Sequence, residues 1–440
     1  MKPTVVVVDP VSTGKCVVLE FVNRGFNVLA VLLELKSNLK ICQDMLEACQ
    51  QVFSYSGDTQ KLVQEIEAAS DNIGVVTAGC ENGVELANEL AHHFGTLSNP
   101  PEMRLARRNK YNMGEAVRAA GVRAVEQSFA MCTEDVDNFL ARWTPEPYKI
   151  IVKPNESAGS DDVFLCHSDE EVRAAFRKIQ GTPNALGVTN HGALIQEFLS
   201  GSEFVVDTIS RNGVHKICAI WKYDKRHVNG QFNVYFGMSL EDASDEQFTP
   251  LIEYAFSVLD ALQIKNGPGH AEFIVTPTGP CLVEIGTRPM GISGFWQPLT
   301  SGACGVDQIT STVKAYTDPV AFDELPVVPK RKLFGSVVFM VSYESGYINE
   351  LPGLEMTKSL ESYVQMNFSY KTGDFCNVTI NVFTMTGMVL LMHESSQQVE
   401  NDVAAIHDMC KAGNFIVIER SNKPQHPALE TEAVVEMKEA

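Results

Sequence analysis

Two apolar segments that each carry one glutamate constrain this sequence most, because together they predict a β-hairpin with an acidic face. Residues 271–276 and 281–285 are apolar runs, and the Pro-Thr-Gly-Pro sequence near their junction is typical of a turn. Glu272 lies in the first run and Glu284 in the second, so their carboxylates are predicted to face each other across paired strands. Such a pair is unfavourable among apolar residues unless a cation lies between them. A divalent ion with oxygen ligands meets this demand, most commonly Mg²⁺ with nucleotide phosphates. The alternative is an ordinary hairpin with two exposed glutamates.

An arginine and a histidine flank the hairpin. Arg288 follows Glu284 by four residues, where its planar guanidinium is suited to bind phosphate or carboxylate. His270 precedes Glu272 by two residues and has two interpretations. It either orients a substrate carboxylate or accepts a proton from an amine, or it is a hydrogen-bonded core histidine.

Length and charge limit the classes of function. A chain of 440 residues is long enough for two to four domains, and its apolar fraction of 45% is typical of a soluble globular protein. The formal net charge of -20 argues against nucleic acid or an anionic membrane surface as a partner. No apolar run approaches the roughly 20 residues of a membrane span. The first residues enter a predicted strand without the apolar segment of a secretory signal.

The 11 cysteines are scattered singly, without a C-x-x-C pair or zinc-ligand spacing. This usage favours buried thiols in a reducing compartment, so a cytoplasmic location is expected.

Residues 1 to about 100 alternate strand and helix patterns, which predicts a parallel sheet with helices on its faces. The segment 11–15, Val-Ser-Thr-Gly-Lys, faintly resembles a phosphate loop, but it has one glycine and Lys15 is followed by Cys16. A strand-to-helix turn that requires Gly14 is the favoured interpretation. Strands are expected at residues 4–8, 26–33, 52–55 and 73–77.

The next region carries two lysines of interest. A basic amphipathic helix is predicted over residues 104–120 and contains Lys110. Lys153 ends a predicted strand, and a small, flexible loop and a second strand follow. The tip of such a hairpin can place backbone N–H groups on phosphate oxygens, with the lysine as a point charge. A solvent loop beside a surface lysine is the alternative. The loop residues are Ser157, Ala158, Gly159 and Ser160.

Beyond a boundary at residues 327–332, strands dominate. They are predicted at residues 335–342, 363–368, 378–384 and 389–393, followed by a helix at 398–412 and a last strand at 415–419.

The order of these elements resembles that of the ATP-grasp ligases. A lysine at a strand end precedes a glycine-containing loop, then the segment Gln-Glu-Phe-Leu at residues 196–199 with Gly201-x-Glu203, and last the hairpin with Glu272, Glu284 and Arg288. The resemblance implies an α/β and α+β architecture. It comprises an N-terminal pre-ATP-grasp α/β domain (residues 1–100), an ATP-grasp domain (101–325, with a small lobe at about 125–195 and a large lobe at about 196–325), a C-terminal β-rich lid domain (326–420) and a mobile acidic tail (421–440).

The resemblance also implies roles for single residues. Lys110 and Lys153 look like the lysines that hold ATP phosphates, and residues 157–160 look like the loop that closes over them. Glu272 and Glu284 look like ligands of magnesium, two Mg²⁺ ions being expected, with Mn²⁺ as an alternative. Arg288 looks like the cation that stabilises an acyl-phosphate and a tetrahedral state. The adenine hinge would be Gln196, Glu197, Phe198 and Leu199, with Glu203 at the ribose.

One position departs from the family pattern. Many members read E-x-N-x-R, with the asparagine as a further metal ligand, whereas this chain has Gly286 between Glu284 and Arg288. Either Mg²⁺ is held by two carboxylates with water and phosphates, or another neighbour substitutes. A glycine here is similar to the L-amino-acid ligase branch, which forms dipeptides and related amides. Residues 221–226 and 233–237 resemble that branch too.

The resemblance therefore implies an ATP-dependent ligase that joins a carboxylate, expected to be that of an amino acid, to an amine through an acyl-phosphate. Neither nucleic acid nor a membrane is expected as a partner, and a homodimer is compatible with the sequence. Arg226, Ser293 and Trp296 are candidate substrate contacts, although core packing is favoured for Trp296. The alternatives are a biotin-carboxylase-like or purine-pathway ligase that uses bicarbonate or a small acid, and a catalytically silent nucleotide-binding module.

Overall fold

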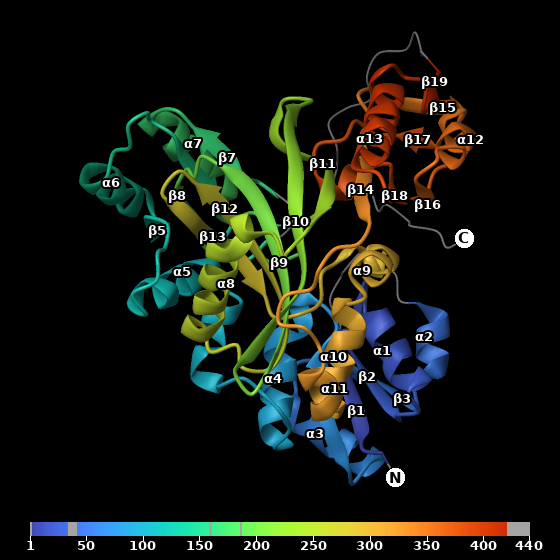
Figure 1. Cartoon of the computed structure of the whole chain (residues 1–440). Coiled ribbons are helices and arrows are strands. Elements are labelled where there is room, and N and C mark those ends of the chain that lie inside the picture. Colours follow the sequence, from blue (N-terminus) through green and yellow to red (C-terminus); the bar gives the residue numbers. More distant parts are fainter. Residues whose placement is uncertain (1, 34–41, 158–160, 185–186, 420–440) are drawn as a thin grey trace. The chain divides into compact units, whose positions relative to one another are not determined.

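The computed structural model describes residues 2–33, 42–157, 161–184 and 187–419 (Figure 1). The chain forms two compact units. The first unit comprises Met1–Ile220, Asp242–Ser301 and Gly305–Lys330, and the second comprises Trp221–Glu241, Gly302–Cys304 and Arg331–Ala440. The predicted tail at 421–440 lies outside the described residues. Within the described ranges, no helix combines the length and the apolar character needed to cross a membrane.

The N-terminal part of the first unit is the predicted parallel α/β fold. Its sheet has the order β3-β2-β1-β4, and every described pairing in it is parallel. The valines of β1 are fully buried, as expected for a central strand covered on both faces. The elements are β1 (Thr4–Val8), α1 (Gly14–Asn23), β2 (Val28–Leu33), α2 (Gln43–Ala48), β3 (Gln51–Tyr55), α3 (Thr59–Ala69), β4 (Ile73–Ala78), η1 (Glu81–Gly83) and α4 (Val84–His93).

The helix predicted over residues 104–120 begins later than expected, with α5 (Lys110–Ala119). Two short 3₁₀ turns, η2 (Pro101–Met103) and η3 (Leu105–Arg107), precede it. Asn109 is the N-cap, because its side chain accepts a hydrogen bond from the backbone N–H of Asn112. Lys110 is consequently the first residue of the helix.

A small antiparallel sheet follows, with the order β5-β8-β6-β7. The predicted hairpin after Lys153 is confirmed by the pairing of β6 with β7. Ser168 caps α7, since its hydroxyl accepts from the N–H of Glu171. The elements are β5 (Gln127–Ala130), α6 (Thr133–Arg142), β6 (Ile150–Lys153), β7 (Phe164–Cys166), α7 (Asp169–Ile179) and β8 (Ala193–Glu197).

The predicted acidic hairpin is formed by β12 (Gly267–Thr276) and β13 (Gly279–Gly286). Strand β12 also pairs with β9 (Ser202–Arg211), and the order in this unit is β13-β12-β9-β10. One face of these strands packs in a core that includes Ala271, Phe273 and Ile285. Strand β10 (Val214–Val228) continues into the second unit, to which β11 (Gln231–Glu241) belongs. The remaining elements up to residue 330 are η4 (Glu246–Phe248), α8 (Thr249–Ala261), η5 (Ile292–Gly294), α9 (Gln297–Cys304), α10 (Gln308–Thr317) and α11 (Pro319–Asp323).

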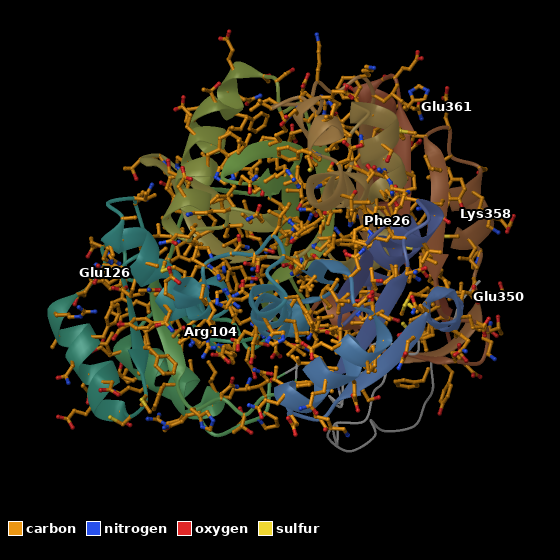
Figure 2. The ribbon with its side chains drawn as sticks, turned by 90° about the horizontal axis from the view of Figure 1, so that it is seen from below. Phe26, Arg104, Glu126, Glu350, Lys358 and Glu361 are labelled. Atoms are coloured by element: carbon orange, nitrogen blue, oxygen red, sulfur yellow. The ribbon has the colours of Figure 1, made fainter. Side chains whose placement is uncertain are left out.

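In the second unit, β11 pairs with β14, which pairs with β18, which pairs with β16. Charged side chains such as Lys358 and Glu361 are exposed at its surface (Figure 2). The elements are β14 (Phe334–Met340), β15 (Gly346–Glu350), α12 (Gly353–Lys358), β16 (Tyr363–Phe368), β17 (Phe375–Cys376), η6 (Val382–Thr384), β18 (Gly387–His393), α13 (Ser396–Lys411) and β19 (Val417–Ile418).

The strand predicted over residues 378–384 is wrong. This segment is irregular and ends in the 3₁₀ turn η6, because side chains take the backbone hydrogen bonds that a sheet would need. Asn381 accepts from the N–H groups of Phe383 and Thr384, and the hydroxyl of Thr379 accepts from the N–H of Ser342.

Candidate active site

The functional candidates of the hairpin lie on one face of the sheet. Glu272 is directly opposite Glu284, and His270 is opposite Gly286. On the other side of β12, Asp207 is opposite His270. Since side chains alternate between the faces of a sheet, these positions all point away from the core face that contains Ala271 and Ile285. The predicted facing of the two glutamates is therefore confirmed, whereas their role as metal ligands stays a prediction.

Lys110 reaches this acidic face from α5. Its Nζ lies 2.5 Å from Oε2 of Glu284 and donates a hydrogen bond of 2.6 Å to the carbonyl oxygen of Ser157. Burial by itself would raise the pKa of Glu284, but the charges of Lys110, Lys153 and Arg288 lower it to about 2. Glu284 is consequently a carboxylate at neutral pH, although its side chain is only 26% exposed.

Lys153 is buried at the end of β6, where a lysine is unfavourable without compensating charge. Burial, with a contribution from the nearby charge of Lys110, lowers its pKa to about 8. The carboxylates of Glu284, Glu272 and Glu203 act in the opposite direction. The structure thus brings both candidate phosphate lysines into the electrostatic environment of three candidate carboxylates.

The loop after Lys153 is connected to the start of α5. The side chain of Asn155 accepts from the backbone N–H of Tyr111 at 3.0 Å, and the hydroxyl of Ser157 donates to Asp161 at 2.7 Å. Ala158, Gly159 and Ser160, the remaining residues of the predicted closing loop, lie outside the described residues.

The predicted hinge begins in β8, an inner strand of the small sheet, and continues past the end of that strand. Gln196 is buried in β8, and its side-chain amide donates to Gln127 at 2.8 Å. The Glu197 carboxylate accepts from the backbone N–H of Glu126. Phe198 and Leu199 follow the strand, and Glu203 lies in β9 opposite Ile274. Because the alternation on β9 places Glu203 and Asp207 on one face, Glu203 belongs to the same acidic face.

His270 is held by a carboxylate that sequence reasoning missed. Its Nδ1 lies 2.8 Å from Oδ1 of Asp207, whose side chain is 1% exposed. A hydrogen bond from Nδ1 to a carboxylate selects the tautomer in which Nε2 is unprotonated. In the described ranges, Nε2 has no hydrogen-bond partner. This arrangement suits a proton acceptor, although it is also that of a hydrogen-bonded core histidine.

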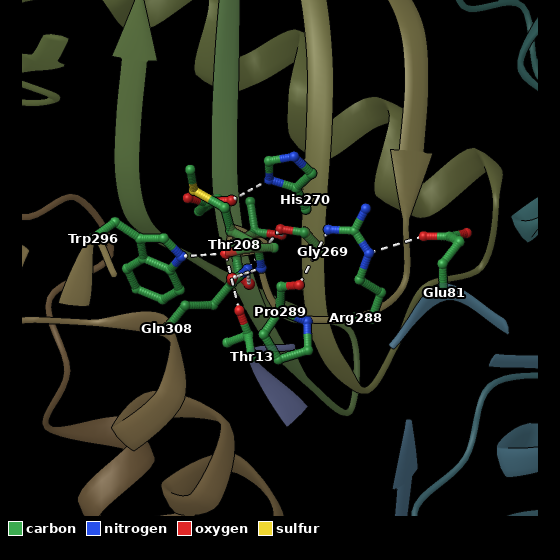
Figure 3. A network of polar contacts seen from close by, with 12 residues as sticks. Thr13, Glu81, Thr208, Gly269, His270, Arg288, Pro289, Trp296 and Gln308 are labelled. Carbon is green, nitrogen blue, oxygen red and sulfur yellow. Dashed lines mark hydrogen bonds and ion pairs between the residues drawn. The ribbon is translucent and has the colours of Figure 1, made fainter. Parts of the chain in front are cut away.

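Arg288 is oriented by two oxygen acceptors (Figure 3). Its Nε donates to Oε2 of Glu81 at 2.8 Å, and its Nη1 donates to the carbonyl oxygen of Pro289 at 3.1 Å. Burial opposes the charge of Arg288, but Glu81 and other nearby acidic groups raise its pKa. Sequence reasoning also missed Glu81. Its position just after β4 was the available signal, because the carboxyl ends of parallel strands commonly carry functional groups.

The segment after Arg288 is fixed by side chains from distant parts of the chain (Figure 3). The hydroxyl of Thr13 and the indole Nε1 of Trp296 both donate to the carbonyl oxygen of Gly291, at 2.9 and 3.0 Å. The backbone N–H of Met290 donates to Gln308, which in turn donates to backbone carbonyls of β9 and β12. Trp296 is therefore part of the buried framework of this segment.

Two further candidate substrate residues have different surroundings. Ser293 has a positive φ of 56°, and its backbone N–H donates to the hydroxyl of Ser12 at 3.1 Å. Arg226 lies in the second unit, where it forms an ion pair with Asp224 and packs over the ring of Phe236. The predicted contact of Arg226 with substrate stays a prediction.

The described residues contain no group of three or more His, Cys, Asp or Glu side chains that could hold a metal ion. Glu272 and Glu284 therefore do not belong to a closed cage built by the protein alone. Two carboxylates with open positions suit Mg²⁺, which commonly takes one or two protein carboxylates and completes its octahedron with phosphates and water.

The sequence resembles those of known proteins. Residues 146–297 match the family model described as ATP-grasp domain. The chain is 29% identical to dapdiamide A synthase of Enterobacter agglomerans over 417 residues, 93% of this chain and 96% of that protein. It is 24% identical to the L-arginine-specific L-amino acid ligase of Bacillus subtilis over 304 residues, 68% of this chain and 70% of that protein.

Solved structures share the fold. The L-amino acid ligase from Bacillus licheniformis aligns with a TM-score of 0.73 at 17% identity, covering 95% of this chain and 99% of that one. Phosphoribosylglycinamide synthetase from Anaerococcus prevotii aligns with a TM-score of 0.66 at 14% identity, covering 95% and 100%. At such identities the likeness shows a common fold and leaves the substrate undetermined.

Proposed function

We propose that this chain joins two amino acids through an amide bond. It is an ADP-forming carboxylate–amine ligase of the ATP-grasp superfamily and of its L-amino-acid ligase branch. The observation that carries this proposal is the acidic sheet face, where Glu272 and Glu284 lie opposite each other beside Lys110 and Lys153. So many charged groups close together and partly buried lower the stability of a fold, because each charge loses water. Such clusters are typical of a site that binds a charged ligand.

ATP phosphates are the ligand that these charges suit. Lys110 and Lys153 supply positive charge, and the loop that begins at Ser157 supplies backbone N–H groups. The Gln196–Leu199 segment would bind the adenine edge through its backbone, and Glu203 would bind the ribose. The hydrogen bond from Nζ of Lys110 to the carbonyl oxygen of Ser157 links α5 to the start of this loop.

Enzymes of this superfamily use ATP with Mg²⁺, and a structural neighbour contains MgADP. We assign Glu272 and Glu284 as the carboxylates that hold the ion, because their oxygen atoms are hard donors that lie opposite each other across the hairpin. Two carboxylates suit two ions, and Mn²⁺, which accepts the same ligands, is an expected substitute. When bound, the metal neutralises phosphate charge and polarises the transferred phosphoryl group.

The chemistry requires activation, because a free carboxylate has no adequate leaving group. An oxygen of the acid substrate attacks the γ-phosphorus of ATP, ADP leaves, and an acyl-phosphate forms. The lysines hold the phosphates in line, and Arg288 stabilises the negative charge on the acyl-phosphate.

The second step forms the amide. The neutral amine of the second substrate attacks the carbonyl carbon, the tetrahedral state gains negative charge near Arg288, and phosphate leaves. A proton must leave the attacking nitrogen, and Nε2 of His270 is the group we assign to accept it. Asp207 would hold the imidazole with Nε2 unprotonated and stabilise the cation that forms.

The substrate pocket is assigned to the segment after Arg288. Ser293 lies within it, and Trp296 supports it. The names of the two sequence relatives, a dapdiamide synthase and an amino acid ligase, support amino acids or their amides as substrates.

The deciding experiment measures ADP and phosphate release in the presence of ATP, Mg²⁺ and mixtures of amino acids, with product masses determined in parallel. We expect release that depends on amino acids and products heavier than either substrate. Release that depends on bicarbonate, or nucleotide binding without turnover, would contradict the proposal.

A further inference from the structure

The position where many ATP-grasp ligases carry asparagine is Gly286 in this chain, and a carboxylate from the N-terminal sheet occupies the space of the missing side chain. A Cβ atom built on Gly286 would lie 2.6 Å from Oε2 of Glu81. It would also lie 3.2 Å from Nε and 3.3 Å from Cζ of Arg288. The first distance is closer than non-bonded atoms approach, so any side chain here would have to displace Glu81.

Glu81 cannot move without losing its partners. Oε2 accepts the 2.8 Å hydrogen bond from Nε of Arg288, and Oε1 lies 3.8 Å from Nε of Arg108. The three side chains are 18%, 17% and 11% exposed for Glu81, Arg288 and Arg108, so solvent screens these charges only partly.

The backbone that carries Glu81 is closely packed against the first strand. Glu81 begins η1 just after β4, and the N–H of Gly79 donates to the carbonyl oxygen of Val8 at 2.8 Å. A Cβ on Gly83 would lie 2.6 Å from that same carbonyl oxygen. The backbone position of Glu81 is therefore fixed, and the length of its side chain determines where the guanidinium of Arg288 lies.

The contacts of Arg288 leave one terminal nitrogen available. Nε is bound to Glu81 and Nη1 to Pro289, and Nη2 makes no hydrogen bond to any described residue. Figure 3 shows the guanidinium between its two acceptors. Two fixed contacts on a planar group determine its orientation, so the direction of Nη2 is determined as well.

We propose that Glu81 is a positioning residue for the ligase reaction, and that Gly286 is present because the Glu81 carboxylate must pass over it to reach Arg288. This assignment rests on the proposed function of Arg288. It also explains what replaces the asparagine that many ATP-grasp ligases carry at the position of Gly286. The Glu81 carboxylate takes the space of that side chain, where it supports the guanidinium of Arg288. A role for Glu81 as a third carboxylate ligand of a metal is disfavoured, because no three acidic side chains in the described ranges are close enough.

The test is a set of variants at these two positions, with kcat and KM measured for ATP and for each amino acid. Glu81→Gln is expected to lower kcat about 10- to 100-fold, the usual effect of removing a group that orients a catalytic one. The KM for ATP and the affinity for ADP, measured by calorimetry, should change less than about twofold, since the partners of Glu81 are Arg288 and Arg108 and neither is assigned to the nucleotide. Glu20→Gln is the matched control, because Glu20 also accepts from an arginine Nε, that of Arg24, at 2.6 Å in a part-buried pair.

The steric part of the proposal is tested by rescue. Gly286→Ala should lower kcat about tenfold, because the new methyl group displaces the Glu81 carboxylate. Glu81→Asp shortens that side chain, so by itself it should lower kcat, whereas combined with Gly286→Ala it should raise kcat above that of Gly286→Ala alone. This reversal of sign is expected only if the two side chains compete for one space.

The outcomes separate the two proposals. A wild-type enzyme that forms no amide contradicts the proposed function before any variant is compared. An active wild-type enzyme with an unchanged kcat in Glu81→Gln overturns the positioning role. Additive effects of Glu81→Asp and Gly286→Ala on kcat overturn the steric pairing. A loss of rate that is accounted for by weaker ADP binding and a lower melting temperature of the variant overturns it as well.

Discussion

Two lysines of this protein lie near the end of a β-strand, Lys15 after β1 and Lys153 at the end of β6, and their surroundings differ. Lys15 follows β1, beside Gly14, and is partly exposed. Lys153 ends β6, is buried, and has its pKa lowered to about 8 by burial and by the charge of Lys110. A lysine kept in such an environment, with carboxylates of Glu284 and Glu272 nearby, costs stability and is therefore a stronger functional candidate.

The turn before Lys15 has a structural function. The hydroxyl of Thr13 donates to the carbonyl oxygen of Gly291 and accepts from the N–H of Gly294, both at 2.9 Å. The hydroxyl of Ser12 accepts from the N–H of Ser293. These contacts hold the segment that follows Arg288. A glycine–lysine pattern in a sequence therefore does not indicate a phosphate site by itself. The charges and hydrogen bonds around the lysine decide whether it is a functional candidate.

The largest effect is expected from removing the carboxylate of Glu284, which lies near Lys153. Glu284→Gln should lower kcat at least about 1,000-fold, because it removes both the assigned metal ligand and the partner of Lys110. The fold should be retained, as measured by circular dichroism. Glu355→Gln is the control, since Glu355 forms a 2.8 Å pair with Lys358 and is 81% exposed. An unchanged rate in Glu284→Gln would remove this residue from the metal site.

The two lysines can be compared directly. Lys153→Ala should raise the KM for ATP about 100-fold, because a buried charge on phosphate is worth a few kcal/mol. Lys15→Ala should change it less than about twofold. Initial-rate measurements over a range of ATP concentrations test both, and equal effects of the two substitutions would refute the distinction.

A pH dependence follows from the lowered pKa of Lys153. Below about pH 8 its amine is charged and attracts phosphate, and above this pH the free enzyme loses that charge. The value of kcat/KM for ATP should therefore fall as the pH rises through about 8. The same profile in Lys153→Ala should lack this step, and a step that persists there would have to come from another group.

The effect of pH on the stability contributed by Lys153 is opposite to its effect on kcat/KM, because stability should rise with pH. Its folded-state pKa of about 8 lies below its ordinary value of 10.5, so between these pH values the unfolded chain binds the additional proton. The contribution of Lys153 to the free energy of unfolding should rise with pH across this window. Urea unfolding of the wild type and of Lys153→Ala at pH 8 and pH 10 gives this difference, which should vanish if the folded-state pKa is ordinary.

The smallest effect is expected at the turn before Lys15. Thr13→Val keeps the shape of the side chain but removes both hydrogen bonds to the segment after Arg288, which should lower the free energy of unfolding by about 1–3 kcal/mol. The KM of an amino acid substrate should rise while the KM for ATP stays constant. Ser257→Ala is the control, because its exposed hydroxyl donates only within α8. A shift in the KM for ATP alone would assign this turn to the nucleotide after all.

Local pattern predicted part of the site for a clear reason. Alternating apolar residues set the faces of a strand, and the short turn at Gly279 sets the register, so the opposition of Glu272 and Glu284 followed from residues close in sequence. The strand end at Lys153 was predicted in the same way. The segment at 378–384 shows the limit, because Thr379 and Asn381 replace ladder hydrogen bonds with side-chain ones.

The sequence by itself determined the resemblance to the ATP-grasp ligases, through the order of its motifs, and the acidic hairpin, through residue type at short spacing. Tertiary structure alone decided that Asp207 lies against His270, and that Glu81 passes over Gly286 to Arg288. These partners are separated by about 60 and about 200 residues, so no local periodicity relates them. Only the pairing of β9 with β12, and the packing of the turn after β4 near Gly286, bring their side chains within hydrogen-bond distance.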